Sequence, residues 1–388
     1  MATTVITGVQ YSGIWSLAGQ ANAKALGTWP AQPAPALYSW GQNTYGGLGI
    51  GNTTNYSSPK QVGVLTNWLL ISSANYSTFA VKTDGTLWAW GNNGSGRLGL
   101  GNTANYSSPK QIGALTAWLQ VSAGYSCGMA VKTDGTLWGW GANAYGQLGL
   151  GNTTNYSSPK QVGSLTNWLT ISAGYSHCAA IKTDGTLWAW GRNQAGALGL
   201  NNTTNYSSPK QIGALTAWLK VAAAGYTGYT LALKTDGTLW SWGGNNYGQQ
   251  GRGSTSPSQS PVQVGALTDW STIVSAVQGD FVLATKTNGT IWGWGRNQVG
   301  QLGVGNITYY SSPKQIGSLT TWLQAACGYR HGSAVKTDKT IWSWGRNNNG
   351  QLGIGNITNY SSPKQIGSLV TWTQVTCGAN QTHATALV

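Results

Sequence analysis

Short apolar runs alternate with turn-forming residues along the whole chain, and one repeating unit contains four of them. In the unit from residue 68 to residue 118, Trp68 opens the first apolar run. Asp84-Gly85, between the second and third runs, is a strong signal for a two-residue β-hairpin. A loop rich in Gly and Asn separates the third run from the fourth. The pattern predicts four strands in meander order, at residues 68–73, 77–82, 87–91 and 108–113.

The dipeptide Trp-Gly ends the third predicted strand and recurs at steps of 50 to 52 residues. A fixed period of this length indicates a repeat architecture. One such sheet cannot bury both of its faces, whereas seven sheets packed around an axis cover one another. We therefore predict an all-β fold, a seven-bladed β-propeller of four-stranded antiparallel blades, over residues 36–388. The pairs begin at Trp40, Trp90, Trp140, Trp190, Trp242, Trp294 and Trp344.

Aromatic residues occupy fixed places in each unit. A second Trp, such as Trp88, stands two residues before the Trp-Gly pair, with Tyr38 in its place in the first unit, and a third Trp opens the first strand. Residues two apart on a strand point to the same face. Each blade therefore offers an aromatic ridge to its neighbour, and each buried large side chain contributes about 1.5–3 kcal/mol.

The two ends of the chain complement each other. Residues 383–388 are typical of a second strand without a following hairpin, and residues 36–41 of a third strand with nothing before it. We predict that the N- and C-terminal strands share the last blade. Closure of this kind removes the open sheet edges that invite aggregation.

Charge is scarce, because charged residues make up only 7% of the chain and Glu is absent. The net charge of +14 raises the possibility of nucleic-acid binding. The Lys residues recur about twice per repeat, so they form no stripe, and a solubilising role is favoured. The four Cys show no disulfide framework. We find neither a signal peptide nor an apolar stretch long enough to span a membrane.

The repeat resembles that of the regulator of chromosome condensation family, over about residues 36–388. The resemblance rests on a strand ending in Trp-Gly, a Gly-x-Leu-Gly loop, a Pro-led strand, Ala-Gly and an Asp-Gly hairpin. It implies a seven-bladed propeller. One unit shows these features at Trp90-Gly91, 96–99, Pro109, Ala123-Gly124 and Asp134-Gly135.

The founding activity that this resemblance implies is nucleotide exchange on the small GTPase Ran, together with chromatin binding. Such members carry a His after the Ala-Gly of many repeats, and an inserted wedge. Here only His177 and His331 hold that position, and no repeat carries an insertion longer than two residues. We therefore do not expect exchange activity, but a regulator-type scaffold for a GTPase or chromatin stays open as an alternative.

Catalytic groups are few. Five of the seven Asp lie in the hairpin motif, where a turn role explains them, which leaves Asp269 and Asp280. A sugar-cleaving enzyme, a further alternative, would need two such acids to converge. His177-Cys178 lacks the spacing of a metal site. We predict a protein that is not an enzyme, with no catalytic residue, cofactor or metal.

The loop Asn-Thr-Thr-Asn-Tyr-Ser-Ser recurs in six units with small variations, whereas the fifth unit departs from it at residues 253–261. Tyr, Asn and Ser make an adaptable contact surface. Equally, the Tyr rings could pack on the next blade while the Asn side chains satisfy the turn. As candidate binding residues on one rim we name Tyr56, Tyr106, Tyr156, Tyr206, Tyr310 and Tyr360.

Residues 1–35 fall outside the repeat and end in a Pro/Ala linker. Gly-x-Trp-x-Leu and Gly-x-Trp-Pro bracket a Gln/Ala stretch, which resembles short segments of bacteriophage virion proteins. We predict a docking segment with Trp15, Leu17 and Trp29 as candidate contacts. Its partners would be other virion subunits.

These observations favour a non-enzymatic binding or structural module of a phage virion, as a tail-fibre, tail or capsid-decorating subunit. It would be made in the host cytoplasm, join an oligomeric assembly through residues 1–35, and present its rims to a host-surface glycan or protein. Nucleic acid and membrane are not expected partners. A purely structural subunit is the remaining alternative.

Overall fold

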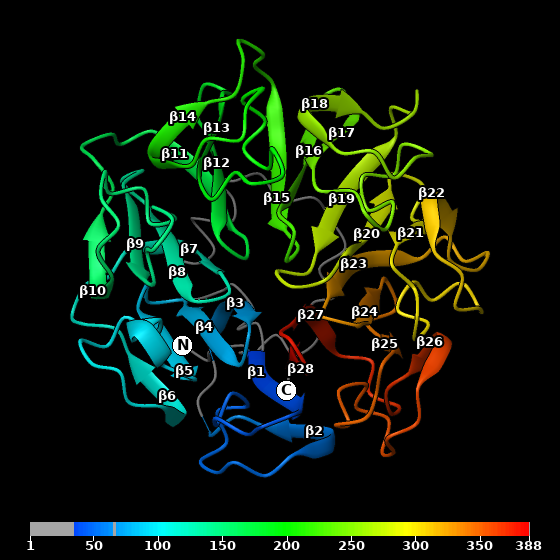
Figure 1. Ribbon diagram of the computed structural model, residues 1–388. Helices are drawn as coiled ribbons and strands as arrows, with labels where there is room; N and C mark the ends of the chain where they lie inside the picture. Colours follow the sequence, from blue (N-terminus) through cyan, green and yellow to red (C-terminus); the bar gives the residue numbers. More distant parts are fainter. Residues whose placement is uncertain (1–34, 65–66, 388) are drawn as a thin grey trace, which may run out of the picture. The chain divides into compact units, whose positions relative to one another are not determined.

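The computed structural model describes residues 35–64 and 67–387, which belong to one compact unit, Pro35–Val388. Seven four-stranded antiparallel sheets are arranged as blades around a central axis, as the sequence predicts (Figure 1). We number the blades 1 (β3–β6), 2 (β7–β10), 3 (β11–β14), 4 (β15–β18), 5 (β19–β22), 6 (β23–β26) and 7 (β27, β28, β1 and β2).

From the axis outwards, each blade has an inner, a second, a third and an outer strand. The inner strands are β3 (Trp68–Ala74), β7 (Trp118–Ala123), β11 (Trp168–Ala173), β15 (Trp218–Ala224), β19 (Trp270–Ser275), β23 (Trp322–Cys327) and β27 (Trp372–Cys377). The second strands are β4 (Ser77–Lys82), β8 (Cys127–Lys132), β12 (His177–Lys182), β16 (Tyr229–Lys234), β20 (Phe281–Lys286), β24 (His331–Lys336) and β28 (Gln381–Leu387).

The third strands are β5 (Leu87–Gly91), β9 (Leu137–Gly141), β13 (Leu187–Gly191), β17 (Leu239–Gly243), β21 (Ile291–Gly295), β25 (Ile341–Gly345) and β1 (Pro35–Gly41). The outer strands are β6 (Tyr106–Gln111), β10 (Tyr156–Gln161), β14 (Tyr206–Gln211), β18 (Ser258–Gln263), β22 (Tyr310–Gln315), β26 (Tyr360–Gln365) and β2 (Tyr56–Gln61). A 3-10 turn, Gly94–Gly96, follows β5.

Both ends of the chain build blade 7, which confirms the predicted closure. β1 pairs antiparallel with β28 along its whole length, from Pro35 opposite Leu387 to Gly41 opposite Gln381. In Figure 1 the two strands lie side by side at the opposite ends of the colour scale. The order β2-β1-β28-β27 therefore takes two strands from each end of the described chain.

The outer strands begin two residues earlier than the sequence pattern suggested. In blade 1 the loop was expected to run to Tyr106, but Tyr106 itself pairs with Gly91 and opens β6. An irregularity between Ala89 and Gly91 lets the ladder restart there. The repeated Tyr is thus a strand residue at the outer edge of the blade.

The Trp residues form the core between blades. The ring of Trp68 meets Trp88 and Trp90 of the same blade edge-on, with centroids 6.2 and 5.9 Å away. The indole Nε1 of Trp90 donates to the Gly47 carbonyl of blade 7, at 3.0 Å. Each ridge therefore packs against the preceding blade, where burial and a satisfied indole N–H both favour the contact.

Glycine is required after the third-strand Trp. Gly91 has a φ of +101°, and a Cβ added there would lie 2.1 Å from the Tyr76 carbonyl oxygen. The chain turns into the loop at this point while touching the backbone of its own blade. This close approach explains why Trp-Gly is the most regular feature of the sequence.

Candidate functional site

Strand order sorts the loops onto two ends of the ring. The connections from inner to second strand and from third to outer strand lie at one end, and the hairpins and blade-to-blade connections lie at the other. We call the first end the arginine face, because it carries all six Arg: Arg97, Arg192, Arg252, Arg296, Arg330 and Arg346. The second end, the hairpin face, carries six of the seven Asp: Asp84, Asp134, Asp184, Asp236, Asp269 and Asp338.

A buried asparagine fixes each loop between a third and an outer strand. In blade 1 the Oδ1 of Asn93 accepts a hydrogen bond from the Leu98 N–H at 2.9 Å, and its Nδ2 donates to the Asn102 carbonyl at 3.0 Å. Buried polar groups satisfied in this way hold one loop conformation. The same residue recurs as Asn43, Asn143, Asn193, Asn245, Asn297 and Asn347.

Arginines on this face stack on tyrosines. The guanidinium of Arg192 lies 4.9 Å from the ring centre of Tyr145 in the preceding blade, and that of Arg296 lies 4.8 Å from Tyr247 in the same relation. Arg330 lies 4.8 Å from the ring of its neighbour Tyr329. Stacking of this kind holds a cation in place while leaving N–H groups for a ligand.

Three tyrosines form a row on the arginine face, one from the loop between the inner and second strands of each of blades 2 to 4. Tyr125 and Tyr175 stack with centroids 4.1 Å apart, and Tyr226 meets Tyr175 edge-on at 4.9 Å. Tyr226 is 61% exposed. Sequence reasoning did not single these residues out, although the Gly-Tyr step before the second strand, as at Gly124-Tyr125, repeats along the chain and could have shown them.

Asp280 is the single acid among the described loops of the arginine face. Its buried carboxyl lies 3.8 Å from Arg296. Burial raises the pKa of Asp280 to about 6, although Arg296 and Arg330 act to lower it. The carboxyl thus anchors an arginine rather than reaching solvent.

The six candidate rim tyrosines lie at the start of the outer strands, half-buried. In blade 7 the Tyr56 hydroxyl accepts a hydrogen bond from Asn52 at 3.3 Å, and the Lys60 ammonium lies 5.3 Å from its ring centre. The same Lys contact is found at Tyr106, Tyr156, Tyr206, Tyr310 and Tyr360. Binding through these tyrosines stays a prediction, as does docking through Trp15, Leu17 and Trp29, which lie outside the described residues.

The three histidines join blades. Nε2 of His177 lies 3.0 Å from the Thr230 hydroxyl of the next blade, and that hydroxyl donates to the Ala197 carbonyl, so the imidazole N–H is the donor. His331 and His383 form the same link to Thr382 and Thr78 at 2.9 and 3.1 Å. Burial lowers the pKa of His177 to about 4, and of the other two to about 3.

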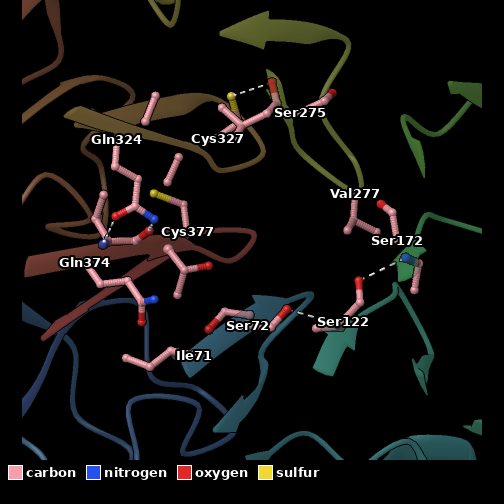
Figure 2. A pocket seen from close by; sticks show the side chains of 18 of the residues that line it. Ile71, Ser72, Ser122, Ser172, Ser275, Val277, Gln324, Cys327, Gln374 and Cys377 are labelled. Atoms are coloured by element: carbon pink, nitrogen blue, oxygen red, sulfur yellow. Dashed lines mark hydrogen bonds between the residues drawn. The ribbon is translucent and has the colours of Figure 1, made fainter. Parts of the chain in front are cut away.

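The inner strands line a central cavity of about 230 Å³. Two of its serines bind the next blade: Ser122 accepts the Ala173 N–H at 2.9 Å, as Figure 2 shows, and Ser172 accepts the Ala223 N–H at 2.9 Å. Cys327 and Cys377 project from adjacent strands in the same view, as free, buried thiols. Burial raises the pKa of both thiols, so they stay protonated.

The two acids outside the hairpins do not converge. Asp269 precedes β19 at the hairpin face, where Lys286 binds it at 3.1 Å, whereas Asp280 precedes β20 at the arginine face. A paired-carboxylate mechanism of sugar cleavage needs both groups within one site. Within residues 35–64 and 67–387 no group of three His, Cys, Asp or Glu is placed to hold a metal ion.

Sequence comparison places this ring in a known family. The model of the RCC1-like domain matches residues 115–386, and that of the regulator of chromosome condensation (RCC1) repeat matches 36–81 and 84–131. The chain belongs to the RCC1 repeat family. Mouse protein RCC2 is 38% identical over 89 residues, which are 23% of this chain and 17% of that protein. The Arabidopsis thaliana ultraviolet-B receptor UVR8 is 32% identical over 111 residues, 28% of this chain and 25% of the receptor.

The crystal structure of Prp20p from Saccharomyces cerevisiae, described with its binding properties to Gsp1p and histones, has the same fold. Its TM-score is 0.82 at 20% identity, over 92% of each chain. The matched segments cover a quarter or less of the two curated relatives named above. Among the described residues, no helix is long and apolar enough to cross a membrane.

Proposed function

We propose that this RCC1-family propeller is a non-enzymatic protein-binding scaffold, and that its arginine face holds an anionic surface of a protein partner. The observation that carries the proposal is the confinement of every Arg to one face, among exposed Tyr. Arg and Tyr are enriched at protein interfaces and their hot spots, whereas Lys and Asp are depleted there.

The partner class follows from chemistry and from the family. Asp280 is already engaged by Arg296, so the face offers guanidinium groups in excess of carboxylates. Prp20p is described as binding Gsp1p and histones, which makes Gsp1p and histones suitable first partners to test. We do not extend the proposal to nucleotide exchange, because the repeat carries no insertion longer than two residues.

A paired set of variants tests the proposal. Arg192, Arg296 and Arg330 would be changed together to Gln, and Lys60, Lys110 and Lys160 together to Gln as a control with the same change in charge. Binding of each partner is measured by calorimetry at two salt concentrations. We expect the Arg variant to lose about tenfold or more in affinity, and the Lys variant about twofold or less. Equal losses would show that net charge, not this face, drives binding.

The virion role predicted from residues 1–35 gains no support from the family match, and neither does binding of a host-surface glycan. Deletion of residues 1–34 tests the docking segment directly. If docking is right, the shortened chain folds, but it no longer joins the assembly that the full chain joins.

A further inference from the structure

A pocket of about 540 Å³ opens on the arginine face where blade 3 meets blade 4. Arg192 and Gln194 line it from the loop between β13 and β14, and Tyr226 from the loop between β15 and β16. Asn246 and Gln259 complete the polar wall. Its volume falls within the range of about 300–1,000 Å³ that is usual for binding pockets.

The pocket lies where one repeat departs from the others. Gly244 follows the Trp-Gly pair of blade 4, at the position where blades 3, 5 and 6 hold Arg192, Arg296 and Arg346. A Cβ at Gly244 would lie 2.7 Å from the Thr227 hydroxyl, so a side chain there would clash with Thr227, which also lines the pocket. The outer strand of blade 4 departs from the repeat as well. It begins with Ser258, where every other blade has Tyr.

The groups in the pocket select an anionic, hydrogen-bonding occupant. Arg192 is its single charged lining residue, and no carboxylate of the described chain lines it. The guanidinium is held in place by Tyr145, at 4.9 Å, and by a hydrogen bond to Gln194. The carboxamides of Asn246 and Gln259 each offer a donor and an acceptor, as a peptide group requires, and Gln194 adds its NH₂ group as a donor.

We propose that this pocket binds a short acidic segment of the protein partner. One carboxylate pairs with Arg192, the carboxamides hold the segment's backbone, and a neighbouring side chain packs on Tyr226. The proposal rests on the proposed function and narrows it, because it makes the junction of blades 3 and 4 the centre of the interface. A peptide suits the site better than an isolated small ligand, since Tyr226 in the pocket wall also contacts Tyr175, which in turn stacks on Tyr125.

The probe is a fluorescein-labelled octapeptide of alternating Glu and Asp, titrated with the full chain and followed by fluorescence anisotropy. An octapeptide of alternating Gln and Asn is the neutral control. The test variant is Arg192→Gln with Tyr226→Ala, and the matched variant is Arg346→Gln with Tyr45→Ala, which removes one Arg and one exposed Tyr of the same face elsewhere in the ring. Circular dichroism checks that both variants fold.

We expect the acidic peptide to bind and the neutral one not to bind. The test variant should weaken binding about tenfold, and the matched variant should change it by about twofold or less. In amide NMR spectra, a nitroxide on the peptide should broaden the side-chain signals of Gln194 and Asn246 before those of Gln42 and Asn348.

Four outcomes would overturn the proposal. Equal weakening by both variants would show that binding is spread over the face, and the proposed function would survive. Binding of glucuronate at this site without binding of the peptide would make the pocket a saccharide site. Absence of peptide binding while Gsp1p or histones still bind would place the interface elsewhere, whereas absence of all binding would remove the proposed function as well.

Discussion

The guanidinium of Arg192 lies 4.9 Å from the ring centre of Tyr145, and the two residues belong to neighbouring blades. The contact is therefore a link across a blade junction as well as a way of positioning a cation. The same geometry joins Arg296 to Tyr247 two junctions further along the ring. One kind of contact thus serves both the stability of the ring and the chemistry of its face.

A double-mutant cycle should detect this coupling. Arg192→Gln and Tyr145→Leu, singly and together, should show an interaction free energy of about 0.5–1 kcal/mol in urea unfolding, the usual value for a partly exposed cation–π pair. Strictly additive effects would mean that the two side chains are neighbours without a favourable contact.

The free energy of unfolding should decrease as the pH is lowered below 6.5. The three buried histidines have lowered pKa values of about 4, 3 and 3, so the unfolded chain binds more protons than the folded chain between pH 6.5 and 4. Each histidine contributes a slope of up to about 1.4 kcal/mol per pH unit in that window. Asp280 has the opposite effect below pH 6 and stabilises the folded chain as the pH falls. Its pKa is raised to about 6, so the folded chain binds this proton at a higher pH than the unfolded chain does. Three histidines outweigh one carboxyl, so the net slope remains destabilising.

The variant His177→Gln provides the control for this pH dependence. Gln381 occupies the equivalent position in blade 7, so the substitution has a counterpart in the ring itself. Urea unfolding between pH 7 and 4.5 should show a slope reduced by about one proton. An unchanged slope would contradict the assignment of a neutral, buried His177.

Gly91→Ala should destabilise the ring strongly. The added Cβ would lie 2.1 Å from the Tyr76 carbonyl oxygen at a φ of +101°, and we expect a loss of about 3 kcal/mol or more. Gly113→Ala is the matched control, because Gly113 also has a positive φ, +56°, but a Cβ added there would meet nothing within 4 Å. Its expected cost is only about 1–2 kcal/mol. Equal thermal shifts for the two variants would show that the close backbone contact carries no cost.

Ser122→Ala tests the bonds between inner strands. The change removes the acceptor of the Ala173 N–H, with an expected cost of about 1–2 kcal/mol. Blades 4, 5 and 6 have Ala222, Val274 and Ala326 at the same position, so the ring tolerates the loss at other junctions. Ala222→Ser is the reverse variant, and thermal unfolding of both variants measures the effect.

The sequence was sufficient for the architecture because the fold depends on local signals that repeat. Trp-Gly, the Asp-Gly hairpin and the complementary ends each act within one blade, so reading one unit was enough to place the rest. The regular spacing of Lys, in contrast, concealed the segregation of Arg. That segregation emerges only when loops are sorted by the end of the sheet at which they lie.

The pocket between blades 3 and 4 was beyond sequence reasoning for a different reason. It depends on the distance between Gly244 and Thr227, which belong to separate loops and touch only in the folded ring. The departure of residues 253–261 from the repeat was visible, but not the hollow that accompanies it. The rim tyrosines, by contrast, were named as candidates because their loop repeats along the sequence. The sequence did not show that a Lys contacts each of their rings in the folded chain.

The shared construction of blade 7 has a consequence for synthesis. A ribosome makes β1 first and β28 last, so six blades can form while the seventh still lacks its middle strand. A polypeptide cut short before Gln381 would leave β1 and β27 each with an unpaired edge, open to pairing with other chains. Closure of the ring thus depends on β28, since a chain that stops before this strand cannot join β1 to β27.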